Sequence, residues 1–198
     1  MSRPRIAFIG TGGTIASLGE GPFDIADYIR HGRMMQAEAL LAYWPQVQEV
    51  AEVTPVPFAA VPSTAIGPAH WLALLRLCEE VAAAQAPDGI VIGHGTASLE
   101  ETAYFLSLTW KHETPIVVVG AQRPSSGLSS DAGMNLANAC RVAGDPGARG
   151  LGALVVMNDE IHAAREVTKT STSRLQTFRS PDMGCLGHAD ADAIAWYR

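Results

Sequence analysis

The sequence predicts an α/β fold, a three-layer sandwich around a mainly parallel, flavodoxin-like sheet. Short apolar runs bounded by glycine, such as residues 6–9 and 89–92, are rich in β-branched side chains and are typical of strands buried on both faces. Segments with helical spacing of apolar residues lie between such runs. Strands that alternate with helices favour a parallel sheet with right-handed crossovers. We expect the strand order 2-1-3-4-5, counted along the chain.

The expected elements follow from these patterns and from their boundary residues. Strands are predicted at 6–9, within 47–53, and at 89–92, 115–120 and 152–157. Helices are predicted at 36–43, from Pro68 onward, at 98–108 and at 131–142. Pro45 ends the first helix, and Ser98 with Glu101 forms a capping-box pattern at the start of the third. Irregular segments are expected at 19–32 and 121–130, and short extended pieces after Asn158 end within 193–197.

Composition favours one globular domain over residues 1–198. The chain is 47% hydrophobic and 17% charged, and its length is sufficient for a core without disulfides or metals. Its 20 acidic residues outnumber 14 basic ones, giving a net charge of −6. Without a basic stripe, this balance argues against nucleic acid as a partner and suits a small neutral or zwitterionic ligand.

The cysteines and histidines predict neither a disulfide framework nor a metal site. Cys78, Cys140 and Cys185 stand far apart, and the six histidines show no ligand spacing. We therefore expect no metal and no cofactor, with Cys78 and Cys140 packed as small apolar residues. No run approaches the length of a membrane span, so we expect no membrane association and a cytoplasmic location.

Two glycine-threonine loops directly follow predicted strands, at residues 10–14 and 94–96. The carboxyl ends of parallel strands bind ligands where the strand order reverses, and the order 2-1-3 makes the first and third strands neighbours across that point. Thr14 and Thr96 are thus expected on opposite lips of one crevice. Glycine allows backbone N–H groups to approach a ligand, while threonine supplies a reactive hydroxyl. The alternative is a pair of ordinary strand-to-helix turns.

In sequence order, these and later motifs resemble the bacterial-type L-asparaginases, specifically their N-terminal domain. The matching segments are 11–16, 94–96 with 100–103, and 120–124, followed by Asp131, Asn135, 158–159 and 167–170. The resemblance implies an asparaginase-like catalytic domain that hydrolyses a small carboxamide, asparagine or a related amide, to a carboxylate and ammonia. It also implies that the smaller C-terminal domain of the family is absent from this chain.

Catalytic roles are implied by the same resemblance. Thr14 is similar to the nucleophile that forms an acyl-enzyme, and Thr96 to the second threonine, which positions or activates water. Lys169 matches the lysine hydrogen-bonded to that second threonine. Tyr28 matches the tyrosine of the mobile loop, which takes the proton of the nucleophile, when one residue is inserted before the next glycine.

Substrate binding is implied at Ser63, where the family binds the α-carboxylate, and at Gly13, Gly95 and Ala97 around the two loops. Independently of the family, an amide needs a proton acceptor for the hydroxyl and polarisation of its carbonyl. Lys169 acts as a base only if burial leaves it partly neutral, and we favour an orienting role for it.

Other polar residues of the matching segments are expected to serve caps, loop hydrogen bonds and subunit contacts rather than the site. These residues are Glu100, Glu101, Arg123, Asp131 and Asn135.

Two positions set this chain apart from the family pattern. Ala97 stands where the family has the aspartate that binds the α-ammonium of the substrate, and Thr64 stands where a glutamine is frequent. A hydrogen bond to a charged group contributes about 1.5–3 kcal/mol, or roughly 10- to 150-fold in affinity or rate. We therefore hypothesise a substrate that lacks the free α-amino acid head or is recognised from elsewhere.

The family also carries an acidic group on its C-terminal domain, which reaches the neighbouring subunit. The sequence leaves open whether this chain is a natural short form, a fragment or one of two subunits, and we expect a homo-oligomer or a separate chain with that domain. Two other functions stay open: a catalytically reduced amide-binding or interaction subunit, and the ammonia-producing subunit of an amidotransferase. The lack of a basic region for tRNA lowers the weight of the latter.

Overall fold

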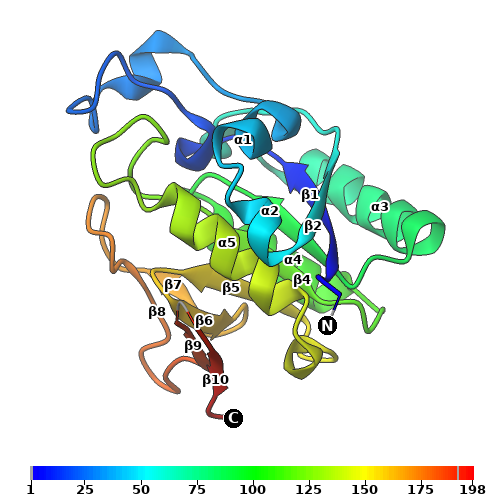
Figure 1. Cartoon of the computed structure of the whole chain (residues 1–198). Helices are drawn as coiled ribbons and strands as arrows, with labels where there is room; N and C mark the ends of the chain where they lie inside the picture. The colour runs from blue at the N-terminus through cyan, green and yellow to red at the C-terminus, as the bar shows by residue number, and fades with distance from the viewer. Residues whose placement is uncertain (1, 191) are drawn as a thin grey trace.

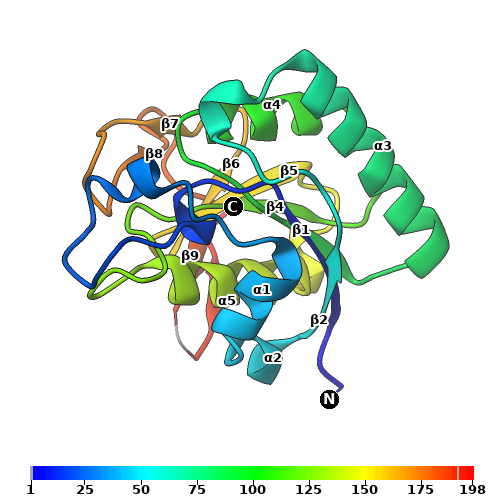
Figure 2. The ribbon, with the colours of Figure 1, turned by 90° about the horizontal axis from the view of Figure 1, so that it is seen from above.

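A twisted sheet lies between two layers of helices in the computed structural model, which describes residues 2–190 and 192–198. Figures 1 and 2 show α1, α2 and α5 on one face and α3 and α4 on the other. The helices are α1 (Ala37–Tyr43), α2 (Val47–Val50), α3 (Pro68–Gln85), α4 (Leu99–Thr109) and α5 (Ala132–Ala143). Short 3₁₀ turns occupy Thr14–Ala16, Tyr28–His31, Ser63–Ala65 and Pro146–Ala148. The predicted three-layer α/β architecture is confirmed.

The sheet has the order β10-β9-β6-β5-β4-β3-β1-β2. Its parallel strands are β1 (Arg5–Gly10), β2 (Glu52–Val56), β3 (Gly89–Gly93), β4 (Ile116–Val119) and β5 (Ala153–Met157). The predicted order 2-1-3-4-5 is therefore correct. The antiparallel strands β6 (Glu160–Ala163), β9 (Gly187–Ala189) and β10 (Ile194–Trp196) extend the sheet beyond β5. A separate hairpin pairs β7 (Thr168–Lys169) with β8 (Phe178–Arg179).

Each face of the sheet has its own apolar core. Phe8, Leu40 and Leu136 belong to the core under α1, α2 and α5, whereas Leu74 and Leu106 belong to the core under α3 and α4. Because successive side chains of a strand point to opposite faces, strands buried on both faces read as continuous apolar runs. This burial explains why β3 and β4 are uniformly apolar in the sequence.

Cys78 and Cys140 lie one in each core, and both are fully buried. Burial raises the pKa of both thiols to about 12, so they remain protonated. The prediction that they pack as small apolar residues is confirmed.

Two local predictions are wrong. Residues 47–50 form the helix α2 instead of beginning a strand, and the strand starts only at Glu52. Val47 and Val50 are three residues apart, a spacing that fits one helical face, and Val47 packs into the core. The Gln48 side chain then exchanges two hydrogen bonds with the backbone of Val53, which fixes the turn into β2.

The capping box at the start of α4 is also absent. Ser98 is the N-cap residue, but its side chain makes no capping hydrogen bond. Its Oγ instead donates to the carbonyl oxygen of Ser63 at 2.6 Å. A contact between distant segments thus replaces the local one.

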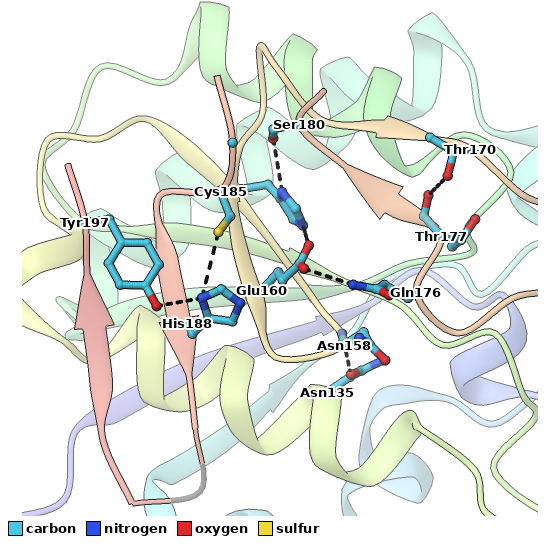
Figure 3. A network of polar contacts seen from close by, with 12 residues as sticks. Asn135, Asn158, Glu160, Thr170, Gln176, Thr177, Ser180, Cys185, His188 and Tyr197 are labelled. Atoms are coloured by element: carbon cyan, nitrogen blue, oxygen red, sulfur yellow. Dashed lines mark hydrogen bonds and ion pairs between the residues drawn. The ribbon is translucent and has the colours of Figure 1, made fainter. Parts of the chain in front are cut away.

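Polar contacts hold the C-terminal strands against the rest of the fold, as Figure 3 shows. The backbone N–H of Asn158 donates to Asn135 Oδ1 at 3.0 Å, which ties the end of β5 to α5. Thr170 donates through both its N–H and its hydroxyl to the carbonyl oxygen of Thr177, closing the β7–β8 hairpin. That hairpin fixes the position of Lys169.

His162 is the most deeply buried titratable group of this network, with no exposed surface. Its Nδ1 lies 3.1 Å from Ser180 Oγ, and its Nε2 lies 3.3 Å from Glu160 Oε2 without the alignment of a hydrogen bond. Burial lowers the pKa of His162 to about 4, although Glu160 opposes the shift. The ring is therefore neutral in the folded protein at pH 7.

No helix in residues 2–190 and 192–198 is both long and apolar enough to cross a bilayer.

The buried His162 predicts a loss of stability in mild acid. Its folded pKa of about 4 lies below the unfolded value of about 6.5, so the unfolded chain alone takes up this proton between those pH values. As the pH falls between those values, this group should lower the free energy of unfolding by about 1.4 kcal/mol per pH unit.

Urea unfolding between pH 7 and 5 measures this slope of the free energy of unfolding against pH. His162→Gln should reduce it, and His112→Gln, at an exposed position, is the control; equal slopes in all three proteins would contradict the prediction.

Candidate active site

The two glycine-threonine loops meet at the carboxyl ends of β1 and β3, which are neighbours in the sheet. The N–H of Thr11 donates to the carbonyl oxygen of Gly93 at 2.8 Å, so the pairing continues past both strands. Gly13 then turns with φ of +82°. A Cβ atom at Gly13 would lie 2.1 Å from Gly95 Cα, a distance that no side chain allows. Glycine at both positions therefore lets the loops come into backbone contact.

A cavity of about 790 Å³ opens beside this contact. The predicted site residues on its wall are Gly13, Thr14, Tyr28, Ser63, Thr96, Ala97 and Lys169. Gly95 is not on the wall but behind it, packed between Gly13 and the Ser63 side chain. The chain thus brings together residues that lie up to 156 positions apart in the sequence, from Gly13 to Lys169.

Thr14 begins the 3₁₀ turn Thr14–Ala16, and its hydroxyl lies 2.7 Å from the Tyr28 hydroxyl. Tyr28 comes from the second 3₁₀ turn, within the predicted irregular segment, and its side chain is largely buried. Burial raises the pKa of Tyr28, the hydrogen bond from Thr14 opposes this, and the charges of Asp131 and Asp24 add to the rise. The phenol is therefore protonated near neutral pH.

Thr96 forms the second pair, in which Lys169 Nζ donates to Thr96 Oγ1 at 2.7 Å. Burial lowers the pKa of Lys169, and the negative charge of Glu100 raises it. The two effects oppose each other, so the charge of Lys169 depends on Glu100 as well as on its own burial.

Glu100, which we expected outside the site, does not line the cavity but contacts Lys169, which does. Its carboxylate accepts a hydrogen bond from the backbone N–H of Lys169 and another from Thr168 Oγ1 at 3.2 Å. One acid thereby fixes the backbone of Lys169 and contributes to its electrostatic environment. No local pattern indicates this contact, because the two residues lie 69 positions apart in the sequence.

The loop that carries Thr96 rests on a chain of hydrogen bonds from two helices. Trp71 Nε1 of α3 donates to Thr102 Oγ1 of α4 at 2.9 Å, and Thr102 Oγ1 lies 2.9 Å from His94 Nε2. His94 Nδ1 lies 2.7 Å from the carbonyl oxygen of Gly95. Burial lowers the pKa of His94 to about 4, so its ring is neutral. A hydrogen on Nδ1 then donates to the Gly95 carbonyl and leaves Nε2 as an acceptor towards Thr102, whose hydroxyl is also directed at the carbonyl oxygen of Ser98 at 3.0 Å.

Ser63 and Ala97 lie beside the second glycine-threonine loop. The N–H of Ala97 donates to Ser63 Oγ at 3.2 Å, and the Ala97 side chain is exposed to the cavity. The hydroxyl hydrogen of Ser63 has no acceptor among the described residues.

Asp131 and Asn135 support the loop at 120–123, as expected of residues outside the site. The Asp131 carboxylate accepts from the N–H groups of Gln122 and Arg123 at 2.9 Å each. Asn135 Nδ2 donates to the carbonyl oxygen of Gly120 at 3.0 Å. Gln122, which the sequence analysis did not single out, lines the cavity, and its buried Nε2 has no hydrogen-bond partner in the described part of the chain.

The described residues include no cluster of three or more His, Cys, Asp or Glu side chains able to hold a metal ion. The cavity instead offers two hydroxyl groups, each hydrogen-bonded to a proton-carrying side chain. The backbone N–H groups of Thr14 and Thr96 have no acceptor within the described residues. This set suits nucleophilic attack on a carbonyl whose oxygen the N–H groups receive.

The contact between the loops predicts that Gly13→Ala destabilises the protein. Positive φ costs a residue with a Cβ about 1–2 kcal/mol, and the overlap with Gly95 adds to that cost. Gly67→Ala is the matched control, because nothing lies within 4 Å of an added Cβ there. Urea unfolding should show a loss of at least about 2 kcal/mol for Gly13→Ala and little change for the control. Equal stability of the two variants would show that the loops are not in contact.

Comparison with known proteins covers nearly the whole chain. Residues 5–198 match the sequence model of the asparaginase family described as Asparaginase, N-terminal. L-asparaginase 2 of Bacillus subtilis (strain 168) is 42% identical over 184 residues, which cover 93% of this chain and 48% of the relative. The probable periplasmic L-asparaginase of Haemophilus influenzae is 40% identical over 195 residues, covering 98% of this chain and 54% of the relative. The chain thus spans about half the length of the curated relatives that it matches.

The fold agrees with this relationship. A crystal structure of a probable cytoplasmic L-asparaginase from Campylobacter jejuni superposes with a TM-score of 0.92 at 36% identity. The match covers 99% of this chain and 59% of that one. The chain belongs to the asparaginase family, and it corresponds to the N-terminal domain of that family.

Proposed function

We propose that this chain is an amidohydrolase that cleaves a small carboxamide to a carboxylate and ammonia through a threonine acyl-enzyme. One observation carries the proposal: the Thr14–Tyr28 and Thr96–Lys169 pairs both line one cavity. Relatives named L-asparaginase support it, since their names indicate amide hydrolysis. If the two loops were ordinary strand-to-helix turns, there would be no reason for two hydrogen-bonded hydroxyl pairs to line the same cavity.

In the first step, Thr14 Oγ1 attacks the carbonyl carbon of the amide. The proton of Thr14 passes to Tyr28 Oη, 2.7 Å away, while the phenol gives its own proton to the amide nitrogen. The C–N bond breaks, ammonia leaves, and an ester to Thr14 remains. Because burial raises the pKa of Tyr28, a proton relay suits it better than the role of a permanently ionised base.

Negative charge develops on the carbonyl oxygen as Thr14 attacks. The unpartnered N–H groups of Thr14 and Thr96 are donors of the kind that stabilise such an oxyanion. They belong to the two loops whose glycines are in contact, so the same contact fixes both donors relative to the nucleophile.

In the second step, water attacks the ester and restores the Thr14 hydroxyl. Thr96 lies at the opposite side of the carbonyl position and orients this water. Because Lys169 Nζ donates to Thr96 Oγ1, the hydroxyl hydrogen of Thr96 points away from Lys169. We assign Lys169 the role of an orienting cation, because Glu100 raises the pKa that burial lowers.

Two further expectations go with this function. The substrate is a small-molecule amide, and the chain acts as a homo-oligomer or together with a chain that carries the C-terminal domain. One relative is named a periplasmic L-asparaginase and another a cytoplasmic one, so a cytoplasmic location stays a prediction.

Loss of the Thr14 hydroxyl should abolish turnover. Ammonia release from asparagine, glutamine and simple dicarboxylic monoamides should fall by at least about a thousandfold in Thr14→Ala. Thr14→Ser keeps a nucleophile and should retain measurable activity. Thr109→Ala, which removes a hydroxyl at the end of α4, is the control for general damage. Silence of the unmodified chain on every amide would favour a binding subunit instead.

The pH dependence of activity should report the role of Glu100. Glu100→Gln removes the charge that raises the pKa of Lys169, so this pKa falls. If protonated Lys169 is the active form, activity is lost as pH rises through that pKa, and the alkaline limb of the profile moves to lower pH. Rates measured from pH 5 to 10 test this, with circular dichroism to verify folding. A shift of the acidic limb alone would identify Lys169 as a base and contradict the orienting role.

A further inference from the structure

The charged side chains that line the cavity are all basic. Lys169, Arg33 and Arg123 line the cavity, whereas none of the described Asp and Glu residues does. Lys169 reaches its interior beside Thr96, while Arg33 and Arg123 donate to the carbonyl oxygens of Gly19 and Ser129. The electrostatic field inside therefore favours an anion over a cation.

The carboxylates near the site accept hydrogen bonds from other parts of the protein. Asp131 accepts from two backbone N–H groups of the loop at 120–123. Asp24 accepts from the N–H groups of Glu20 and Asp27, and Glu100 accepts from Lys169 N and Thr168 Oγ1. None of these three lines the cavity. An ammonium group in the cavity would find no anionic partner among the described residues.

Donors, in contrast, are in excess at the wall. Among residues 2–190 and 192–198, the hydroxyl hydrogen of Ser63 has no acceptor, and the buried Nε2 of Gln122 has none either. Beside Ser63 stands Ala97, which is exposed to the cavity and offers only a methyl group. This end of the site can satisfy the oxygens of a carboxylate but not an ammonium group.

On the basis of the proposed function, we infer that the substrate is a carboxamide that carries a carboxylate and no ammonium group, a monoamide of a dicarboxylic acid. Hydrolysis breaks its C–N bond and yields a dicarboxylate and ammonia. Succinamate is the simplest probe, because it is asparagine without the α-ammonium. Butanamide is succinamate with a methyl group in place of the carboxylate.

Calorimetry with the Thr14→Ala chain measures the preference without turnover. Succinamate should bind at least about 10-fold more tightly than L-asparagine, because the ammonium group loses hydrogen bonds to water and gains no charged partner. It should also bind more tightly than butanamide, which lacks the anion. The unmodified chain should show the same order in kcat/KM.

Two variants at position 97 test whether the lack of a carboxylate there causes the preference for succinamate. Ala97→Asp places a carboxylate beside Ser63 and should reverse the preference, with asparagine gaining about 10-fold and succinamate losing affinity by repulsion. Ala97→Asn has the same size without the charge and should keep the preference for succinamate.

The outcomes separate this inference from the proposed function. Asparagine bound or hydrolysed as well as succinamate, or no binding of either compound, would overturn the inference. Preferential binding of succinamate without hydrolysis of any amide would support the inference and overturn the proposed function.

Discussion

The site depends on the backbone contact between Gly13 and Gly95. These glycines belong to loops that leave neighbouring parallel strands, and a single Cβ at Gly13 would lie 2.1 Å from the Cα atom of Gly95 in the other loop. Only this approach brings Thr14 and Thr96 to the wall of one cavity. Glycine adopts the positive φ of Gly13 without the steric cost that a Cβ would impose, and the packing of β1 and β3 between two apolar cores holds the two loops in place.

Around this contact, burial and neighbouring charges set the protonation state of each hydroxyl pair, acting together at Tyr28 and against each other at Lys169. Burial raises the pKa of Tyr28 and keeps the phenol protonated, whereas it lowers the pKa of Lys169, where Glu100 opposes the shift. His94 is neutral behind the same loop and fixes the Gly95 carbonyl. The protein thus surrounds the cavity with proton donors whose charge states are set by groups outside it.

The order of the five parallel strands could be predicted from local patterns along the chain, although the second strand was placed too early. The loops after β1 and β3 predicted the crevice, whereas the roles of Lys169, Tyr28 and Ser63 came from the resemblance to the family and stay predictions. The features that the sequence did not predict depend on contacts between distant segments. Ser98 donates to Ser63 instead of capping its helix, Glu100 binds the backbone of Lys169, and residues 47–50 form a helix because Val47 packs inward. The contacts of Ser98 and Glu100 leave no periodic signal along the chain, whereas the spacing of Val47 and Val50 does fit one helical face.

In the proposed mechanism, both hydroxyl pairs act on one carbonyl group. A crystal structure of the Thr14→Ser chain with a slowly hydrolysed amide would show this arrangement, because the position of the carbonyl carbon relative to residues 14 and 96 can then be measured. We expect a carbonyl carbon about 3–3.5 Å from the residue 14 hydroxyl oxygen, with Thr96 Oγ1 facing the opposite side of the same carbonyl. A carbonyl bound near only one of these residues, or outside the cavity, would exclude the proposed mechanism.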